Sequence, residues 1–383
     1  MKHKSGWLVK LPFLVAALLA VILVVTGCVS GLAPVGWSGG AVSGGKLYVG
    51  SRVGRLVAID LSNDSRLSSE PLVAVSQPGL FGCGPGSSGG LGCGGGSTGV
   101  PVYGTPGVSG NLTYMAGYNG KVYAYNIDTI AVRWVYPREG NLQPIVGGPV
   151  ESDGRLFFGG SDGVVYALNA ALGDKLWEFP TGDKIWGTPA VVGDTLYIGS
   201  FDKKVYALNV ADGSKKWEFV TEGSVIATPL VVGDTVYVGS FDRTFYALNA
   251  ADGSVKWTFA GKNFFWSQPV LVGDNLYVGS LDGFVYVLRA SGLAKLAEFD
   301  LDYPVSSQPV VVGDSVIFVN RKGVVSSVST VTNEIRQLAD LDTGVDGPLA
   351  VNGEIVYIHT QDDVLVRVNA VTGALLTPIP LSG

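Results

Sequence analysis

A near-identical duplication constrains the fold of this chain more than any other feature. Residues 188–219 read TPAVVGDTLYIGSFDKKVYALNVADGSKKWEF, and residues 228–259 read TPLVVGDTVYVGSFDRTFYALNAADGSVKWTF, 40 residues later. Near-identity at a fixed period is the signature of a repeat architecture, in which neighbouring copies bury a continuous core together.

Further copies appear when the sequence is aligned on the proline of this unit. The proline recurs at spacings of 43, 40, 40, 40, 40 and 39 residues, and an earlier copy begins at Trp37 with Gly40 in the place of the proline. The prolines are Pro106, Pro149, Pro189, Pro229, Pro269, Pro309 and Pro348. Eight copies therefore fill residues 37–383 and leave no room for a second domain.

Each copy contains four short apolar runs separated by turn signals. In the fourth copy the runs are residues 190–192, 195–199, 205–209 and 216–219. Gly-Asp and Asp-Gly pairs between them supply the positive φ angles of tight hairpins. Four antiparallel strands per copy, repeated eight times, predict an all-β, eight-bladed β-propeller. A solenoid is the alternative, but its copies usually hold one or two strands or a helix pair.

The first 27 residues predict a secretory signal peptide. Lys2, Lys4 and Lys10 precede an apolar run over residues 11–25. This run is shorter than the roughly 20 residues that a membrane-spanning helix needs. The run ends in Val-Thr-Gly-Cys, which resembles the lipobox of bacterial lipoproteins. An uncleaved N-terminal anchor is the alternative.

The lipobox resemblance implies that Cys28 is lipidated and that residues 28–36 form a tether. The protein is then expected in the cell envelope, outside the cytoplasm. Val29, rather than Asp, follows the cysteine, which favours the periplasmic face of the outer membrane in a two-membrane cell. In a one-membrane cell the same anchor would hold the protein at the outer face of the plasma membrane.

Composition argues against nucleic-acid binding and against a His-rich metal site. Without residues 1–27, which hold three lysines and no acids, the chain carries 23 basic and 32 acidic residues. An acidic protein repels nucleic acid backbones, so nucleic acid is not expected as a partner. His359 is the one histidine that remains, which excludes a His-rich metal site.

A Gly- and Ser-rich insert at residues 76–101 interrupts the repeat between the first and second copies. Its composition predicts a flexible surface loop. Cys83 and Cys93 lie in this loop, and outside the cytoplasm two such cysteines are expected to form a disulfide.

The motif A-L-N-x-x-x-G-x-x-x-W, at residues 167–177, 207–217 and 247–257, resembles the tryptophan-docking repeat of pyrroloquinoline-quinone propellers. Together with the lipobox it resembles the BamB family of outer-membrane assembly lipoproteins. The resemblance implies a lipid-anchored envelope scaffold with protein partners, such as a β-barrel assembly factor. A flat indole beside a glycine turn can stack on the next blade and bury a large apolar area. The expected docking residues are Trp134, Trp177, Trp217 and Trp257.

One face of the predicted ring is the better candidate for partner binding. It carries the blade-to-blade links and the turns between second and third strands, which vary, whereas the turns of the other face are short and uniform. Exposed aromatic residues with interleaved cations are typical of a protein-docking patch. The candidates are Trp186, Phe201, Phe241, Phe264, Phe265 and Trp266, with Lys204 and Arg243. In the alternative, Trp186 and Trp266 close the top of the axial channel.

An enzyme with the same repeat must be weighed against the scaffold. Quinone-dependent members of the resembled family carry adjacent cysteines and a calcium ligand set, and this chain has no adjacent cysteines. Asp residues recur at the equivalent turn positions 162, 202, 242 and 282, where they are expected to form turns. We therefore expect no enzyme, no cofactor and no metal. The alternative is a ligand-binding or quinone-dependent dehydrogenase-type propeller that uses the axial funnel.

Overall fold

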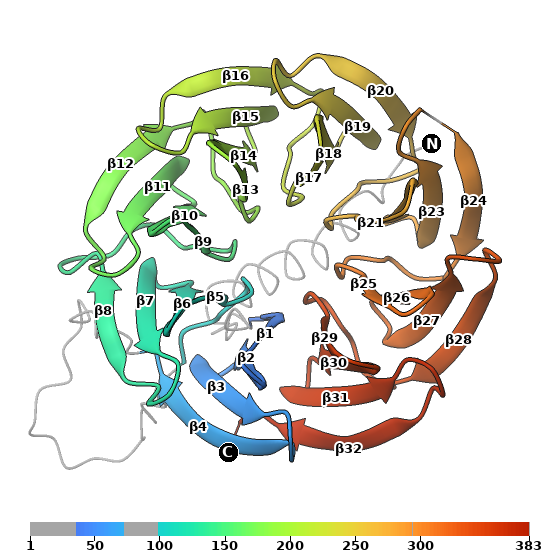
Figure 1. Cartoon of the computed structure of the whole chain (residues 1–383), viewed down its shortest axis with the longest axis horizontal. Helices are drawn as coiled ribbons and strands as arrows, with labels where there is room; N and C mark the ends of the chain where they lie inside the picture. The colour runs from blue at the N-terminus through green and yellow to red at the C-terminus, as the bar shows by residue number, and fades with distance from the viewer. Residues whose placement is uncertain (1–35, 73–98, 293, 383) are drawn as a thin grey trace, which may run out of the picture. The chain divides into compact units, whose positions relative to one another are not determined.

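The computed structural model describes residues 36–72, 99–292 and 294–382, which belong to one compact unit. These residues form eight antiparallel sheets arranged as blades around a central axis (Figure 1). Each sheet has four strands, which follow in sequence order from the axis to the rim. The prediction of an eight-bladed β-propeller is confirmed. Within the described residues, no helix has the length and apolarity that crossing a membrane requires.

The first four blades are built from sixteen strands. Blade 1 contains β1 (Gly40–Ser43), β2 (Lys46–Gly50), β3 (Arg55–Asp60) and β4 (Ser65–Pro71). Blade 2 contains β5 (Gly107–Ser109), β6 (Leu112–Gly117), β7 (Lys121–Asn126) and β8 (Val132–Tyr136). Blade 3 contains β9 (Val150–Ser152), β10 (Arg155–Gly159), β11 (Val164–Asn169) and β12 (Lys175–Pro180). Blade 4 contains β13 (Ala190–Val192), β14 (Thr195–Gly199), β15 (Lys204–Asn209) and β16 (Lys215–Val220).

The other four blades repeat this arrangement. Blade 5 contains β17 (Leu230–Val232), β18 (Thr235–Gly239), β19 (Thr244–Asn249) and β20 (Val255–Ala260). Blade 6 contains β21 (Val270–Val272), β22 (Asn275–Gly279), β23 (Phe284–Arg289) and β24 (Lys295–Asp300). Blade 7 contains β25 (Val310–Val312), β26 (Ser315–Val319), β27 (Val324–Ser329) and β28 (Ile335–Asp340). Blade 8 contains β29 (Ala350–Asn352), β30 (Ile355–His359), β31 (Val364–Asn369) and β32 (Leu375–Pro380).

The core of the molecule lies between the blades. A sheet covered on both faces buries nearly every side chain of its central strands, as β14 and β15 show. One apolar cluster joins Phe157 and Val165 of blade 3 to Leu196 and Ile198 of blade 4. The outer strand β16 is more exposed: Lys215 and Lys216 face solvent, and Trp217 is its one buried residue.

The four predicted docking tryptophans each reach the next blade. The indole N–H of Trp217 donates a hydrogen bond to the carbonyl of Ala250 at 2.9 Å. The indole of Trp177 lies so close to Gly213 that a Cβ there would approach it to 2.6 Å, and Gly213 has a φ of +75°. The glycine of one blade therefore serves the tryptophan of the blade before it. Trp134, Trp177 and Trp257 donate equivalent bonds to the carbonyls of Ala170, Val210 and Ala290.

This pairing explains why the second copy keeps Trp134 but has Ile130 in place of the glycine. Blade 1 carries Ser68 at the tryptophan position, so blade 2 receives no indole from blade 1 and does not require a glycine there. Ile130 is 2% exposed and belongs to an apolar cluster with Tyr48 and Leu56 of blade 1.

Small residues near the axis allow neighbouring backbones to touch. A Cβ on Gly147 would lie 2.6 Å from the carbonyl oxygen of Gly187, and a Cβ on Gly187 would lie 2.8 Å from that of Ile226. The expected crowding of the first strands around the axis is therefore observed.

Two details of the alignment were wrong. Strand β29 begins at Ala350, 40 residues after the start of β25 at Val310, so Pro348 is equivalent to Gln308 rather than to Pro309. Val100, assigned to the flexible insert, is buried in the cluster of blades 1 and 2. The predictions for Cys28, Cys83 and Cys93 lie outside the described residues, as does most of the 76–101 insert.

Candidate functional site on the link face

Antiparallel connectivity sorts the loops onto two faces of the ring. Links between blades and turns between second and third strands lie on one face, which we call the link face. The other turns, such as residues 193–194 and 211–213, lie on the opposite, hairpin face. The link face holds all the residues predicted to bind a partner.

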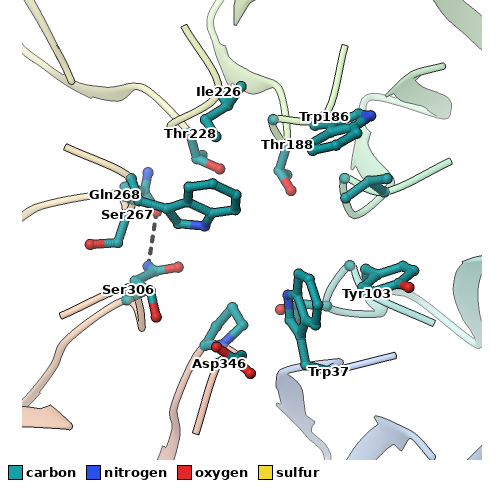
Figure 2. A pocket seen from close by; sticks show the side chains of 18 of the residues that line it. Trp37, Tyr103, Trp186, Thr188, Ile226, Thr228, Ser267, Gln268, Ser306 and Asp346 are labelled. Carbon is teal, nitrogen blue, oxygen red and sulfur yellow. Dashed lines mark hydrogen bonds between the residues drawn. The ribbon is translucent and has the colours of Figure 1, made fainter. Parts of the chain in front are cut away.

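A cavity of about 320 Å³ opens on the link face at the axis. One side chain reaches its wall from each of the seven links and from the segment that enters β1. It stands three residues before the proline of the repeat or at the structural equivalent (Figure 2). These residues are Trp37, Tyr103, Val146, Trp186, Ile226, Trp266, Ser306 and Asp346. Trp186 and Trp266 thus line the axial cavity together with Trp37 and Tyr103. They do not close the channel, which the alternative interpretation expected them to do.

Deeper in the cavity the lining side chains are neutral and polar. They come from the position two residues further along each link: Thr105, Thr188, Thr228, Gln268 and Gln308. The Gln308 amide N–H donates to the Gln268 side-chain oxygen at 2.9 Å (Figure 2), and Gln268 donates to the Pro229 carbonyl at 2.9 Å. The Thr188 hydroxyl accepts the Gly148 N–H at 2.8 Å.

Asp346 is the only charged side chain among the described residues that line this cavity. One of its oxygens lies 3.0 Å from Nε of Arg321, and the other accepts a hydrogen bond from the Gln361 amide at 2.7 Å. The carboxylate is therefore neutralised, and the cavity carries no net charge.

Two groups of predicted patch residues are assembled by ring contacts. Trp186 and Phe201 meet edge to face with centroids 4.8 Å apart, and the Lys184 ammonium lies 5.1 Å from the Phe201 ring. Phe241 stacks on Phe264 at 4.7 Å and also contacts Trp266 at 5.7 Å. All five aromatic side chains are partly exposed. We call them the aromatic patch: Trp186, Phe201, Phe241, Phe264 and Trp266.

Phe265, expected in the exposed patch, is instead fully buried. It packs against Phe245 and Tyr286 between blades 5 and 6. A sequence signal was present, because the equivalent residues of other copies are aliphatic and buried: Ile145, Ile185, Val225, Val305 and Val345. Phe265 is a core residue.

The predicted cations differ in their surroundings. The Lys204 ammonium forms an ion pair with Glu218 of the same blade at 2.8 Å. Arg243 is exposed and has a φ of 71°, and Lys203 has a φ of 70° at the equivalent position.

Lys203 and Arg243 stand where most other blades use a glycine: Gly54, Gly120, Gly163, Gly283 and Gly323. A left-handed conformation costs a residue with a Cβ about 1–2 kcal/mol. Breaking such a local rule is most common at functional sites. This signal in the repeat alignment supports Arg243 and adds Lys203 to the candidates.

The recurring Asp residues of the link face form turns, as predicted. Asp202 accepts hydrogen bonds from the backbone N–H of Lys204 at 3.1 Å and from that of Gly182 in the preceding link at 2.7 Å. It also accepts the Tyr206 hydroxyl at 2.6 Å. Burial and this bond raise the pKa of Tyr206, so the phenol stays a donor at neutral pH. Asp162, Asp242 and Asp282 receive the same tyrosine bond.

The junction that closes the ring, between blades 8 and 1, contains a buried polar group that sequence reasoning missed. His359 is 4% exposed; its Nδ1 lies 3.0 Å from the Ser38 carbonyl and its Nε2 3.0 Å from an Asp363 oxygen. Both neighbouring atoms are hydrogen-bond acceptors. The Arg52 backbone N–H donates to the same Asp363 oxygen at 2.7 Å. Burial acts to raise the pKa of Asp363, but these hydrogen bonds outweigh it and lower the pKa.

The architecture and the docking contacts define the class: an eight-bladed propeller of pyrroloquinoline-quinone-type repeats. Residues 29–178 and 161–376 match the family described as outer membrane protein assembly factor BamB, and the chain belongs to this family. The fold is similar to that of BamB from Moraxella catarrhalis, with a TM-score of 0.67 and 18% identity over 84% of this chain and 93% of that one. A computationally designed protein, Ika8, matches at a TM-score of 0.69 and 14% identity over 85% of this chain and 93% of its own.

A quinoprotein shares a short part of the sequence. Quinoprotein alcohol dehydrogenase PedH of Pseudomonas putida is 41% identical over 64 residues, which is 16% of this chain and 11% of PedH. Pyrroloquinoline quinone is a tricarboxylate, and the described residues lining the axial cavity include no lysine or arginine. The described residues also contain no group of three or more His, Cys, Asp or Glu that could hold a metal ion. The cavity therefore does not fit this quinone with a calcium ion.

Proposed function

We propose that this protein is a lipid-anchored scaffold of the cell envelope that binds a protein partner through its link face. The aromatic patch carries the proposal. Its five partly exposed rings are held in two contact groups on the varied face of the ring. Membership of the BamB family supports a role in protein interaction.

Such a surface gains free energy when a partner covers it. Aromatic and arginine side chains are enriched in interfaces. Aromatic rings bury a large area at a small entropic cost because they have few rotatable bonds. The rings of the patch are fixed by one another, so little freedom is lost on binding. Lys203 and Arg243, held at positive φ beside the patch, supply charge complementarity to an acidic partner surface.

The partner proposed is another envelope protein, such as a β-barrel assembly factor. The family description supports this choice. We propose that lipids on Cys28 hold the ring at the membrane, since stable anchoring takes more than one acyl chain. Cells fed an alkyne-tagged fatty acid should label the wild type but not a Cys28→Ser variant. Equal labelling of the two proteins, or no labelling of the wild type, would contradict the lipid anchor.

The docking proposal is tested by copurification from membranes with the double variant Phe201→Ala/Phe264→Ala. Both side chains belong to the patch and neither lines the axial cavity. The double variant should lose the partner that the wild type retains, with an unchanged thermal melt. The matched control is Val331→Ser, which removes a side chain 73% exposed on the hairpin face and should retain the partner. An unchanged set of partners in the folded double variant would overturn the proposal.

A further inference from the structure

We propose that the axial cavity of the link face is a binding site for a neutral carbohydrate. The cavity of about 320 Å³ lies at the lower end of the range for small-molecule sites, roughly 300–1,000 Å³. Residues from around the whole ring line it, so it suits a compact ligand such as one or two sugar rings.

The wall of the cavity offers aromatic surfaces that are held in place. Trp37 meets Tyr103 edge to face, with centroids 4.4 Å apart and planes at 76°. Trp186 is fixed by Phe201 and by an indole N–H bond of 3.2 Å to the Ser161 hydroxyl. Sugar rings present C–H groups on their faces, and these stack on aromatic rings through weak C–H contacts and dispersion. Rings that are already fixed lose little entropy when a sugar stacks on them.

The deeper lining offers the polar groups that sugar hydroxyls require. Thr105, Thr228 and the amides of Gln268 and Gln308 lie there. An amide has two donors and an acceptor with two lone pairs, and the bonds from Gln308 to Gln268 and from Gln268 to Pro229 use only part of this capacity. Each sugar hydroxyl both donates and accepts, so mixed donors and acceptors suit it better than a set of one kind.

The charges favour a neutral ligand. A bound anion needs an available cation, and no lysine or arginine is among the described residues that line the cavity. Arg321 contacts the lining but is already bonded to Asp346 and to the Ser306 hydroxyl. A bound cation needs an uncompensated carboxylate, and Asp346 is already paired with Arg321 and Gln361. Burying an unpaired charge in such a site is costly.

The test uses the full chain in detergent and three probes of one shape: glucose, glucuronate and glucosamine, with maltotriose as a larger neutral probe. Saturation-transfer NMR and calorimetry measure binding. Glucose or maltotriose should bind saturably and at least 10-fold more tightly than the anionic and cationic probes. No saturable binding of either neutral sugar, or tighter binding of a charged probe, would overturn the proposal.

Variants locate the binding. Trp186→Ala and Thr228→Val should each weaken sugar binding at least 10-fold, the second without loss of any carbon volume in the wall. Tyr303→Ala removes an aromatic side chain 45% exposed on the same face but outside the cavity lining, and should bind as the wild type does. Binding that survives in folded Trp186→Ala and Thr228→Val would place the sugar elsewhere and contradict the site. Trp186 also belongs to the aromatic patch, so Thr228→Val is the variant that separates the two proposals. Thr228 lines the cavity and lies outside the patch, so this variant should lose the sugar and keep the partner.

Discussion

Different contacts hold neighbouring blades together at two places in the ring: between blades 4 and 5, and between blades 8 and 1. At the first, Trp217 packs on Gly253 and donates to Ala250. At the second, His359 bridges the Ser38 carbonyl and Asp363. Figure 1 shows blades 4 and 5, and blades 8 and 1, as neighbouring pairs in the ring. Tryptophan docking joins four of the eight junctions, from blade 2 to blade 6. The junction between blades 8 and 1 holds a buried polar pair at a different position of the repeat. The difference teaches that the repeat does not use one kind of contact at every junction.

The repeat alignment shows which residues His359 replaces at the junction between blades 8 and 1. In blades 4 to 6 its equivalents are Gly199, Gly239 and Gly279, and a Cβ on Gly199 would lie 2.3 Å from the Val225 side chain of the next blade. At the closing junction, Gly36 occupies the place of Val225. At this junction the larger side chain therefore lies on blade 8 and the smaller residue on the segment that enters blade 1. His359 and Gly36 line a cavity of about 170 Å³ there.

The largest effect is expected from Trp217→Ala in a regular junction. Emptying a large buried site costs about 3–5 kcal/mol, and the substitution also leaves the Ala250 carbonyl without its indole donor. Equilibrium denaturant melts measure the loss. A loss below about 1 kcal/mol would contradict the docking role.

A glycine pair sharpens the same comparison. Gly213→Ala combines a positive φ with a Cβ 2.6 Å from Trp177, whereas Gly193→Ala has a positive φ and open space around it. Overpacking and backbone strain together should cost about 2–4 kcal/mol at Gly213, against about 1–2 kcal/mol at Gly193. Equal losses of stability for the two variants in denaturant melts would show that the Trp177 indole moves aside at little cost in free energy.

Much of the fold could be predicted because repetition averages out local ambiguity. The turn and strand positions of eight copies agree, so a strand assigned in blade 4 is also supported by blade 5. The 264–266 link was harder, because three adjacent aromatic residues give no alternation that shows which side chain points inward. The equivalent residues of other copies, Val225 and Val305, are buried and indicate that Phe265 is the one that points inward. The contacts of His359 could not be predicted, because Ser38 is 321 residues away.

The closing junction should respond to acid. The pKa of Asp363 is lowered from 3.8 in the folded state, so its contribution is present above that pH and is lost as pH falls through the folded value. Asp363→Asn should cost about 1–3 kcal/mol near pH 6, the usual value of hydrogen bonds to a charged group. The wild type and the variant should converge as the pH falls through this lowered pKa, because the carboxyl is then protonated. A difference in stability that does not change with pH would contradict the role of the Asp363 carboxylate.

The smallest expected change in folding stability is a gain rather than a loss. Arg243→Gly replaces a residue at φ 71° with one that adopts this angle freely, so it should stabilise the ring by about 1 kcal/mol. It should also weaken partner binding. If the variant is less stable, or binds the partner as well as the wild type does, then the strained backbone at Arg243 does not indicate a binding residue.

The claim that regular residues build the ring while the link face binds a protein is tested most directly by site-specific photo-crosslinking in intact cells. A photoreactive side chain would replace Phe201, Phe241 or Phe264 on the link face, and Leu172 or Val331 on the hairpin face. The account predicts one shared crosslinked envelope protein from the three link-face sites and none from the two hairpin-face sites. Crosslinks to a shared protein from the hairpin face alone would contradict it.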